Sequence, residues 1–506
     1  MNGLPLVLGI DVGTSGAKVL AVDAEGRILA EALSTYPCAT PAPGHSEQDP
    51  RDWVTGTIRG IKKVLRHPEV DPGQVRSIGL TGQMHGLVAL DANNEVVRPA
   101  ILWNDQRSAP QCESTEAALG LEFLLKNTGN RMLPGFTAPK LLWMREHEPD
   151  AYGRIEHVLL PKDYVRFRLG SNLVTDVSDA SGTSVFNCGK RTWSATMLDA
   201  LELPEQWWPD AAESSEVVDT LNADIASELG LAPGLPMVAG AGDQAASAVG
   251  TGIVEEGIVS ATMGTSGVVF ASSSTWRTTP EGSLHAFCHA VPGTWHLMGV
   301  MLSAGGSFGW FNRAITPDIA DAAKARGVDP YDELCGLAAD VQAGAEGLFF
   351  LPYLTGERTP HVDAKARGCF IGLTPAHDRT HLTRAVLEGV SHGMRDCLDL
   401  IRATGVNPSV VRLSGGGARN AFWRQLSTDI FKCRTATTTT SEGTAFGAAI
   451  LAGVGGKLWT DVPSACAAVV RETNHLDPGP ESATQDQLHR RYHGLYPALQ
   501  GWWARG

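Results

Sequence analysis

The sequence has no hydrophobic run long enough to cross a bilayer. Its longest apolar stretch, TAFGAAILAGVGG near the C-terminus, is short and rich in glycine, whereas a membrane-spanning helix needs about 20 predominantly apolar residues. The first residues also lack the basic, apolar and small-residue pattern of a secretory leader. We therefore expect a soluble cytoplasmic protein that has no membrane partner.

Paired cysteines and clusters of basic residues are absent as well. The nine cysteines are widely spaced and never form a CxxC pair, which argues against both a disulfide framework and a zinc site. The formal net charge is −14, and lysine and arginine are scattered along the chain, so a nucleic acid is not an expected partner. These observations favour a small soluble ligand.

The length and an internal repeat predict two domains. A chain of 506 residues with 43% hydrophobic residues is too long for one core and apolar enough for two. Strand patterns flank a GTSG loop twice, and the two loops start at Gly13 and Gly264. Two similar domains explain this repeat. We assign them to residues 1–247 and 256–506, with the boundary in 248–257, whose glycines and charges are typical of a connector.

Strand and helix patterns alternate along both halves. Strands are expected on either side of each loop, over residues 6–11, 18–23, 258–263 and 268–272. Apolar residues at helical spacing predict a helix over 379–401, with Asp378 or Thr380 as its N-cap. The run SVVRLSGGGARNAFWRQL predicts a strand, a glycine turn and a helix that begins near Ala418. The predicted fold class is α/β, with mixed sheets flanked by helices.

The first loop, DVGTSGAK, combines features of a phosphate site. Gly13 lets the backbone approach a ligand, Thr14 and Ser15 add hydroxyl groups, and Lys18 adds a positive charge. Asp11 precedes the loop, and a carboxylate beside phosphate implies a divalent cation between them. The loop is not a Walker motif, and a simple hairpin turn is the alternative explanation. The second loop repeats the pattern with Gly264, Thr265 and Ser266.

Two further segments are candidates for the site. Gly415, Gly416 and Gly417 follow a strand and would let the backbone approach a flat ring, or they form only a helix-entry turn. Asn420 would then contact a base or cap the helix. Asp243 follows a strand and two glycines. It is interpreted equally well as the N-cap of the next helix and as a general base that accepts a proton from an alcohol.

Besides these loops, the sequence contains two longer patterns that are typical of one protein family. They are GFTAPKLLWMREH at 135–147 and GCFIGLTPAHDRTHLTRAVLE at 368–388. The chain resembles the FGGY carbohydrate kinases over nearly its whole length. The resemblance implies two actin-like, ribonuclease H-like ATPase domains with a cleft between them, and ATP and Mg²⁺ as cofactors. It also implies that Asp243 is the catalytic base, that both GTSG loops bind phosphate, and that 415–417 with Asn420 face the adenosine. Mg²⁺ would lie near Asp11 and Asp243, largely through waters. We further expect that the last helix packs back on the N-terminal domain, and a homodimer fits the resemblance.

The same resemblance addresses the substrate through Met84 and His85. Members that act on xylulose carry Met-His where glycerol kinases carry an arginine-glutamate pair, so the implied reaction is ATP-dependent phosphorylation of D-xylulose. A methionine supplies an apolar wall for the sugar, and a neutral histidine both donates to and accepts from hydroxyl groups. The other expected sugar-binding residues are Gln83, Trp103, Asn104 and Asp105.

Two alternatives to xylulose phosphorylation remain. One is a kinase of the same family that acts on ribulose, gluconate or glycerol, and the other is a non-catalytic actin-like ATP switch. Asp176 and Asp179, in the run TDVSDASGT, receive no role from the sequence.

Overall fold

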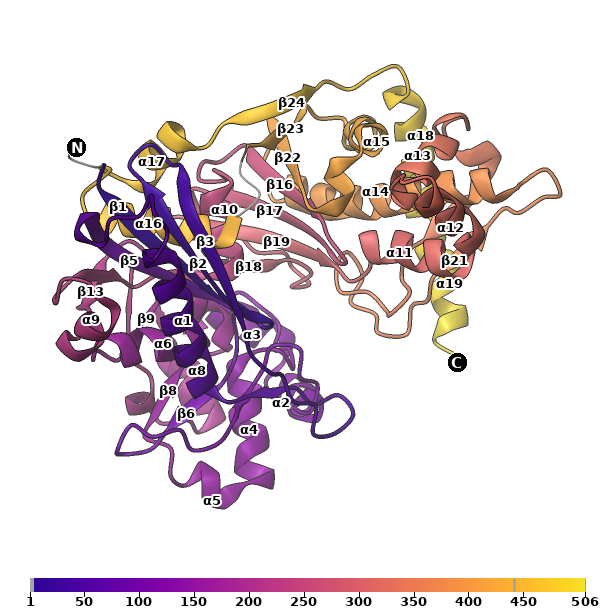
Figure 1. The fold of residues 1–506 in the computed structure, drawn as a ribbon. Helices are drawn as coiled ribbons and strands as arrows, with labels where there is room; N and C mark the ends of the chain where they lie inside the picture. Colours follow the sequence, from indigo (N-terminus) through magenta and orange to yellow (C-terminus); the bar gives the residue numbers. More distant parts are fainter. Residues whose placement is uncertain (1–3, 440–442, 506) are drawn as a thin grey trace.

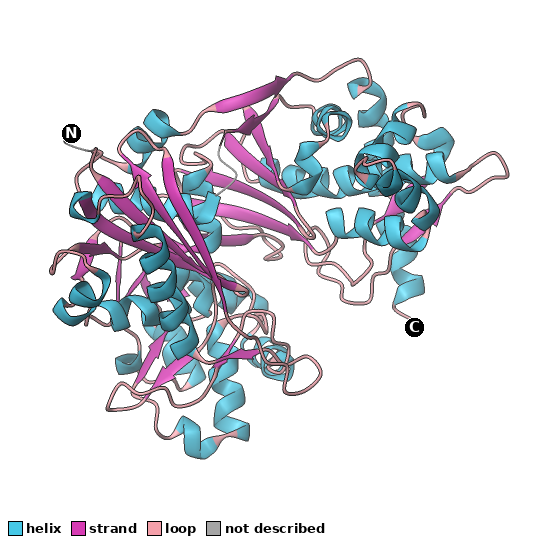
Figure 2. Cartoon of the chain, in the orientation of Figure 1, coloured by secondary structure: helices cyan, strands magenta, loops and turns pink. Residues whose placement is uncertain are grey.

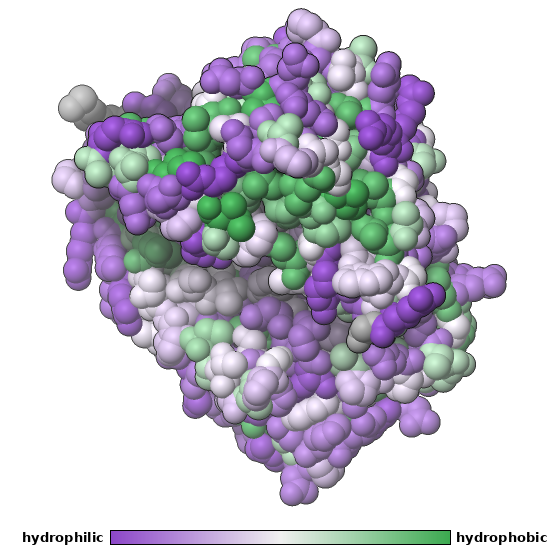
Figure 3. Space-filling model, turned by 90° about the vertical axis from the view of Figure 1, so that its right-hand side faces the viewer, coloured by the Kyte–Doolittle hydropathy of each residue, from purple (hydrophilic) through white to green (hydrophobic). Residues whose placement is uncertain are grey.

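The computed structural model describes residues 4–439 and 443–505 (Figure 1). Two seven-stranded sheets organise the chain, and helices pack on both of them (Figure 2). Viewed from the side that is on the right in Figure 1, a shaded recess separates an upper part with many hydrophobic residues from a lower, mainly hydrophilic part (Figure 3). The predicted α/β fold with two mixed sheets is confirmed.

The N-terminal sheet has the order β13-β14-β5-β1-β2-β3, and β15 pairs with β5. Its central strand β1 is antiparallel to β2 and parallel to β5. The strands are β1 (Leu6–Val12), β2 (Gly16–Asp23), β3 (Ile28–Thr35), β5 (Val75–Gly82), β13 (Val217–Thr220), β14 (Pro236–Val238) and β15 (Ala241–Gly242).

The C-terminal sheet repeats this arrangement in the order β18-β19-β17-β16-β22-β23-β24. Here β16 is antiparallel to β17 and parallel to β22, as β1 is to β2 and β5. The strands are β16 (Ile258–Met263), β17 (Gly267–Ser273), β18 (His285–Cys288), β19 (Trp295–Met301), β22 (Val410–Ser414), β23 (Thr435–Thr438) and β24 (Glu472–Leu476). The GTSG repeat in the sequence therefore corresponds to a repeated strand-turn-strand unit.

Two long amphipathic helices cover outer faces of the sheets. The first, α1 (Pro50–Leu65), packs on β2 and β3, and the second, α14 (Arg379–Ala403), packs on β17 and β19. Asp378 caps α14, since its Oδ1 accepts hydrogen bonds from the backbone N–H groups of Thr380 (2.9 Å) and His381 (3.3 Å). The predicted helix is thus confirmed, and of the two candidate caps the structure selects Asp378.

Helices α10 (Asp243–Gly250) and α16 (Gly443–Gly455) pack against each other between the two sheets. Although α16 comes late in the chain, it lies on β1 and β5 of the N-terminal sheet. Glycines permit this close approach: a Cβ at Gly9 would lie 2.1 Å from the Ala445 carbonyl oxygen, and one at Gly79 would lie 2.1 Å from that of Ala448. The N-terminal sheet is therefore completed by a helix from the second half of the chain.

The last helix differs from our expectation. We expected it to pack back on the N-terminal domain, but α19 (Leu495–Trp503) places Tyr496 and Trp503 against Tyr353, which follows β20 (Phe349–Leu351) of the C-terminal half. The apolar side chains of α19 find partners there, and α16 already occupies the N-terminal sheet.

The helix expected near Ala418 also begins later than predicted. A 3-10 turn, η5 (Gly416–Arg419), comes first, and α15 (Ala421–Phe431) follows it.

Candidate active site

Three segments that are far apart in the sequence leave the N-terminal sheet at one edge. Val12, the last residue of β1, pairs with Gly82 at the end of β5, and Gly82 also pairs with Gly242 at the end of β15. The first GTSG loop and Asp243 directly follow β1 and β15, and the Met84–His85 pair follows β5 after one residue, Gln83. Parallel alignment therefore gathers the predicted phosphate loop, sugar residues and base at the same edge.

Asp11 lies directly beneath the first loop. A Cβ at Gly13 would be 4.0 Å from both Asp11 carboxylate oxygens, and Lys18 is the cross-strand partner of Asp11 on β2. The Tyr36 hydroxyl donates to the Gly13 carbonyl at 2.5 Å. Burial, and then the charge of Asp11, raises the pKa of Tyr36 well above its ordinary value, so this hydroxyl keeps the proton that it donates. Lys18 also forms an ion pair with Glu31, with 3.3 Å between Nζ and Oε2.

Side chains behind the loop hold Thr14 in place. Its hydroxyl donates to Gln83 Oε1 and accepts from Trp103 Nε1, both at 3.0 Å. Gln48 closes the network, because its Nε2 donates to the Thr14 carbonyl (2.8 Å) while its Oε1 accepts from Gln83 Nε2 (2.9 Å) and Trp53 Nε1 (3.0 Å). Gln83 is only 2% exposed, so this geometry makes it a support for the loop. Sequence reasoning missed Gln48, which no motif marks.

The Trp103–Asp105 segment divides into exposed and supporting residues. Trp103 and Asn104 are exposed. Asp105 is buried, and its carboxylate accepts four hydrogen bonds, from the Ser46 N–H and from the backbone N–H, Nε and Nη2 of Arg107. Burial raises the pKa of Asp105, but these donors outweigh burial and hold it below the ordinary value. A carboxylate offers about four acceptor positions, so Asp105 holds the loop and has no acceptor left for a sugar.

Met84 packs against the residue that precedes Asp243. It is 4% exposed, and a Cβ at Gly242 would lie 2.9 Å from its sulfur. Met84 belongs to an apolar cluster that also contains Phe270 and Phe287 from the C-terminal sheet. The methionine therefore forms a wall where the two halves meet.

His85 is held as a neutral ring of one defined tautomer. Its Nδ1 lies 2.9 Å from the Gly182 carbonyl oxygen, its ring stacks on Phe136 at 4.7 Å, and its own carbonyl accepts from Lys140 Nζ at 2.7 Å. Burial, aided by the charges of Lys140 and Arg358, lowers the pKa of His85 to about 3. Because a carbonyl only accepts, Nδ1 carries the proton and Nε2 is an acceptor. The expectation that this ring both donates to and accepts from the sugar is therefore wrong, since its one donor is already used.

Asp243 is the first residue of α10, and the N-cap of that helix is Gly242. The interpretation of Asp243 as N-cap is thus wrong by one residue. Burial raises the pKa of Asp243 to about 6, against the opposing effect of hydrogen bonds with Gln244. Its side chain is only partly buried, so the carboxylate remains accessible from the strand edge. A base with a pKa near working pH suits proton transfer.

The second loop and the third glycine cluster lie together in the C-terminal half. The Gly264 and Thr265 carbonyls accept from the backbone N–H groups of Gly305 (2.8 Å) and Gly306 (3.0 Å) at the start of α11 (Gly305–Ala314). A Cβ at Gly415, whose φ is 82°, would lie 2.6 Å from the Met263 carbonyl oxygen just before the loop. The two glycine segments are therefore neighbours, and α11 supports the second GTSG loop, which the sequence did not indicate.

Asn420 caps α15. Its Oδ1 accepts from the Trp423 N–H at 3.2 Å, and its Nδ2 donates to Asp332 Oδ1 at 2.7 Å. Of the two roles expected for Asn420, the structure shows the capping role.

Family models match both halves of the chain. Residues 6–250 match the N-terminal domain, and residues 259–456 the C-terminal domain, of the FGGY family of carbohydrate kinases. The chain belongs to this family. It is therefore a carbohydrate kinase with the two-domain fold of that family, as the sequence patterns predicted.

Individual FGGY relatives agree with this assignment. The chain is 40% identical to the xylulose kinase of Escherichia coli (strain K12) over 98% of this chain and 99% of the relative. It matches the structure of a xyloylose kinase from Brucella ovis with a TM-score of 0.90 and 38% identity, over 98% of this chain and 99% of that one. A gluconate kinase structure from Lactobacillus acidophilus matches with a TM-score of 0.92 and 26% identity, over 99% and 100%. The overall fold alone therefore does not select the sugar.

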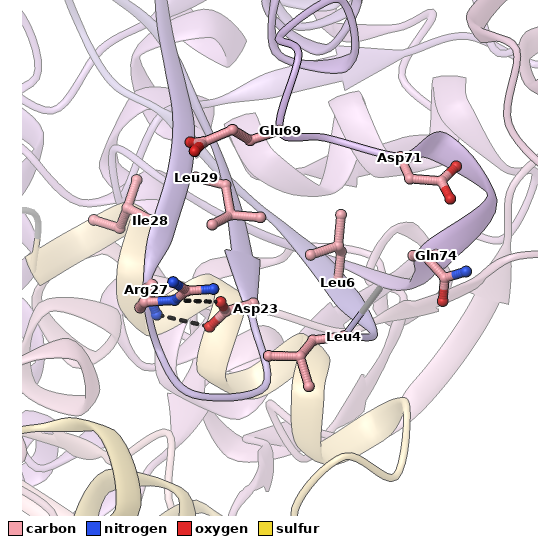
Figure 4. A pocket seen from close by; sticks show the side chains of 9 residues that line it. All are labelled: Leu4, Leu6, Asp23, Arg27, Ile28, Leu29, Glu69, Asp71 and Gln74. Atoms are coloured by element: carbon pink, nitrogen blue, oxygen red, sulfur yellow. Dashed lines mark hydrogen bonds and ion pairs between the residues drawn. The ribbon is translucent and has the colours of Figure 1, made fainter. Parts of the chain in front are cut away.

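A separate hollow lies at the opposite end of β1 (Figure 4). It has a volume of about 360 Å³, and Arg27 at its edge pairs with Asp23, with 2.8 Å between Nε and Oδ2. Because Leu6 begins β1 and Val12 ends it, this hollow is roughly 20 Å from the strand ends of the active edge.

Among the helices of residues 4–439 and 443–505, none has the length and hydrophobicity needed to cross a membrane.

Proposed function

We propose that this kinase transfers the γ-phosphoryl group of ATP to the C5 hydroxyl of D-xylulose, with Asp243 as general base. The observation that carries the proposal is that Gly242, the residue before Asp243, packs on Met84 and pairs with Gly82, from which the chain continues to Met84 and His85. Several relatives at 36% to 41% identity are named xylulose kinases, which supports the same sugar.

The sugar is held by one acceptor and two walls. His85 Nε2 accepts a hydrogen bond from a sugar hydroxyl, because Nδ1 donates to Gly182. Met84 contacts the carbon skeleton, and the exposed indole of Trp103, fixed through Thr14, forms the second wall. Asn104 is exposed and supplies further polar contacts.

Asp243 accepts the C5 hydroxyl proton as that oxygen attacks phosphorus. The new bond joins the sugar oxygen to the γ-phosphorus, the bond to the bridging oxygen of ADP breaks, and the proton moves to the carboxylate. The first and second GTSG loops bind the phosphates through backbone N–H groups, assisted by Lys18. The glycines at 415–417 form the adenosine side, next to the second loop, with Asn420 at its border.

The residues present fit a magnesium ion that enters with ATP. Asp11 is the last residue but one of β1, and Asp243 directly follows β15, and both of these strands pair with β5. The described residues contain no cluster of three or more His, Cys, Asp or Glu side chains that would hold a metal by themselves. Mg²⁺ commonly binds through one or two carboxylates, waters and substrate phosphates, so Asp11 and Asp243 would hold it near the loops. When bound, the ion neutralises charge on the phosphates.

A kinase for gluconate is the alternative that the fold leaves open. Gluconate carries a carboxylate, which needs donors, whereas His85 offers an acceptor at Nε2. The tautomer of His85 therefore favours a neutral ketose or polyol. A non-catalytic ATP switch is disfavoured, because Asp243, the Met84–His85 pair and the first GTSG loop lie at one strand edge.

The test is ADP production with Mg-ATP and a panel of D-xylulose, L-ribulose, D-ribulose, glycerol and gluconate. We expect D-xylulose to give the highest kcat/KM, and Asp243→Ala to lose at least roughly 10²- to 10⁴-fold. Asp224→Ala is the matched control, since Asp224 also lies in the first turn of a helix but is exposed on α9 (Ala223–Leu229). A different preferred sugar would refute the xylulose assignment, and an active Asp243→Ala would refute the base.

The surroundings of the reaction follow from the same proposal. All nine cysteines are free in the structure, which fits a reducing compartment, and ATP is available in the cytoplasm, so we place the reaction there. The homodimer expected from the resemblance stays a prediction.

A further inference from the structure

One short segment contacts several parts of the active site. Residues 176–183, here called the 176–183 segment, comprise the N-cap Asp176, helix α7 (Val177–Ala180) and the turn η2 (Ser181–Thr183). The segment is buried. The segment contains Asp176 and Asp179, to which neither the sequence nor the proposed reaction assigns a role.

The first contact reaches the catalytic base. Ser178 Oγ accepts a hydrogen bond from the Gly242 N–H at 3.1 Å and donates to Asp176 Oδ2 at 2.5 Å. Gly242 directly precedes Asp243 and is the N-cap of α10. The Ser178 hydroxyl therefore holds the backbone from which the Asp243 carboxylate projects.

The second contact reaches the sugar-binding histidine. The Gly182 carbonyl accepts from His85 Nδ1 at 2.9 Å, and this contact sets the tautomer that leaves Nε2 as an acceptor. A Cβ at Gly182 would lie only 2.1 Å from His85 Nδ1. The ring is thus packed directly on the 176–183 segment.

Buried charges anchor this segment. Asp176 Oδ2 also accepts from the Ser178 N–H (2.8 Å) and from Ser214 Oγ (2.9 Å), and Asp176 Oδ1 lies 2.8 Å from Lys162 Nζ. Lys162 is 1% exposed and also faces Asp163 (2.6 Å) and Asp179 (3.3 Å).

These buried ion pairs call for a reason beyond stability. Buried ion pairs often stabilise a fold no more than apolar residues of the same volume would, while they do fix geometry in some proteins. A third contact, from the Cys288 N–H of β18 to Ser181 Oγ at 3.0 Å, ties the segment to the C-terminal sheet. The segment is therefore held from both sides.

We propose that the 176–183 segment positions the catalytic base and the sugar-binding histidine from one anchor. Asp176 and Ser178 orient Asp243 through Gly242, and Gly182 orients His85. These are positioning residues, because they act through Asp243 and His85. The proposal rests on the proposed role of Asp243 as general base.

The two contacts have separable kinetic effects. Asp243 accepts its proton only as the reaction proceeds, so its misplacement lowers kcat. His85 also contacts the bound sugar before reaction, so its displacement raises KM for the sugar. A purely structural segment would lower stability without this division.

The first experiment uses Ser178→Ala in the full-length protein, with D-xylulose and Mg-ATP. We expect kcat to fall roughly 10- to 100-fold, as for a reacting group displaced by about 1 Å, while KM for the sugar changes less than about threefold. Ser184→Ala is the matched control, because the buried Ser184 Oγ has no hydrogen-bond partner among the described residues, and its kinetics should equal wild type. A Ser178→Ala kcat within about twofold of wild type overturns the proposal.

The second experiment uses Gly182→Ala, whose methyl group must displace the His85 ring. We expect KM for D-xylulose to rise about tenfold or more, with a smaller change in kcat. Gly336→Ala on α13 (Pro330–Ala339) is the control, since a Cβ there meets no described atom within 4 Å. A Gly182→Ala variant with unchanged KM overturns the assignment of His85 to this anchor.

A double-mutant cycle separates this proposal from the proposed function. In an Asp243→Asn background, Ser178→Ala should have no further effect on the residual rate, because the group that it positions is gone. A second full loss there overturns the positioning role. If Asp243→Asn alone keeps the wild-type rate, the proposed base fails instead. If wild type prefers another panel sugar, only the xylulose assignment fails, and the variants are judged with that sugar.

Discussion

The environment of Asp243 predicts an acidic limit to the reaction. Its pKa of about 6 means that roughly 90% of the enzyme carries an ionised base near pH 7, but only about 10% near pH 5. An ordinary aspartate, with a pKa of about 3.9, would still be more than 90% ionised at that lower pH. We therefore expect kcat/KM for D-xylulose to fall about tenfold between these two pH values.

The assay is direct measurement of the sugar phosphate at saturating Mg-ATP, in buffers from roughly pH 4.5 to 8. Saturating nucleotide keeps the titration of free ATP out of kcat/KM for the sugar. His85 cannot produce the acidic limb of the profile, in which kcat/KM falls as the pH falls, because its pKa of about 3 keeps the ring neutral throughout this range. His85→Gln should raise KM and leave the limb in place. A flat profile, or a limb that disappears in His85→Gln, would refute the assignment of the titration to Asp243.

Three predictions concern stability and are tested by denaturant unfolding. Above pH 6 the ionised Asp243 destabilises the fold, because its folded pKa of about 6 exceeds the unfolded value. Asp243→Asn should therefore raise the free energy of unfolding by up to about 3 kcal/mol at pH 7.5. An unchanged free energy of unfolding would contradict the raised pKa. Gly79→Ala should lower the free energy of unfolding by about 1–3 kcal/mol or more, because its methyl group would meet the Ala448 carbonyl oxygen of α16 at 2.1 Å. The control Gly336→Ala, on an exposed part of a helix, should raise it by roughly 0.5–1 kcal/mol. Equal effects of the two changes would argue against the close approach of α16. Lys162→Met should lower the free energy of unfolding by about 3–5 kcal/mol, because it leaves buried carboxylates without their cation. An unchanged free energy of unfolding would mean that the carboxylates are protonated or hydrated.

The sequence predicted the strands around both glycine loops to within one or two residues. Glycine turns between short apolar runs are local signals, so β16 was predicted with its observed bounds, Ile258–Met263. Helix α14 was predicted for the same reason, through its apolar spacing and its cap. Local patterns therefore define these elements well.

The partners of polar side chains were not predictable in this way. Gln83 and Asp105 were expected to bind sugar, but Gln48 and Arg107 engage them within the protein. His85 was expected to offer a donor, which Gly182 takes, 97 residues along the chain. Such pairings depend on tertiary contacts between distant segments, and a single sequence carries no signal for them.

The packing of α16 on β1 and β5 also bears on how the protein is made. Both strands have been synthesised by residue 82, whereas α16 ends at Gly455. At a synthesis rate of about 5–20 residues per second, roughly 20 to 75 s pass between the completion of β5 and the completion of α16, which covers the face of the sheet that carries Gly9 and Gly79. The first domain therefore completes its core only after α16 has been made, and until then the nascent chain exposes an apolar surface that a chaperone could bind.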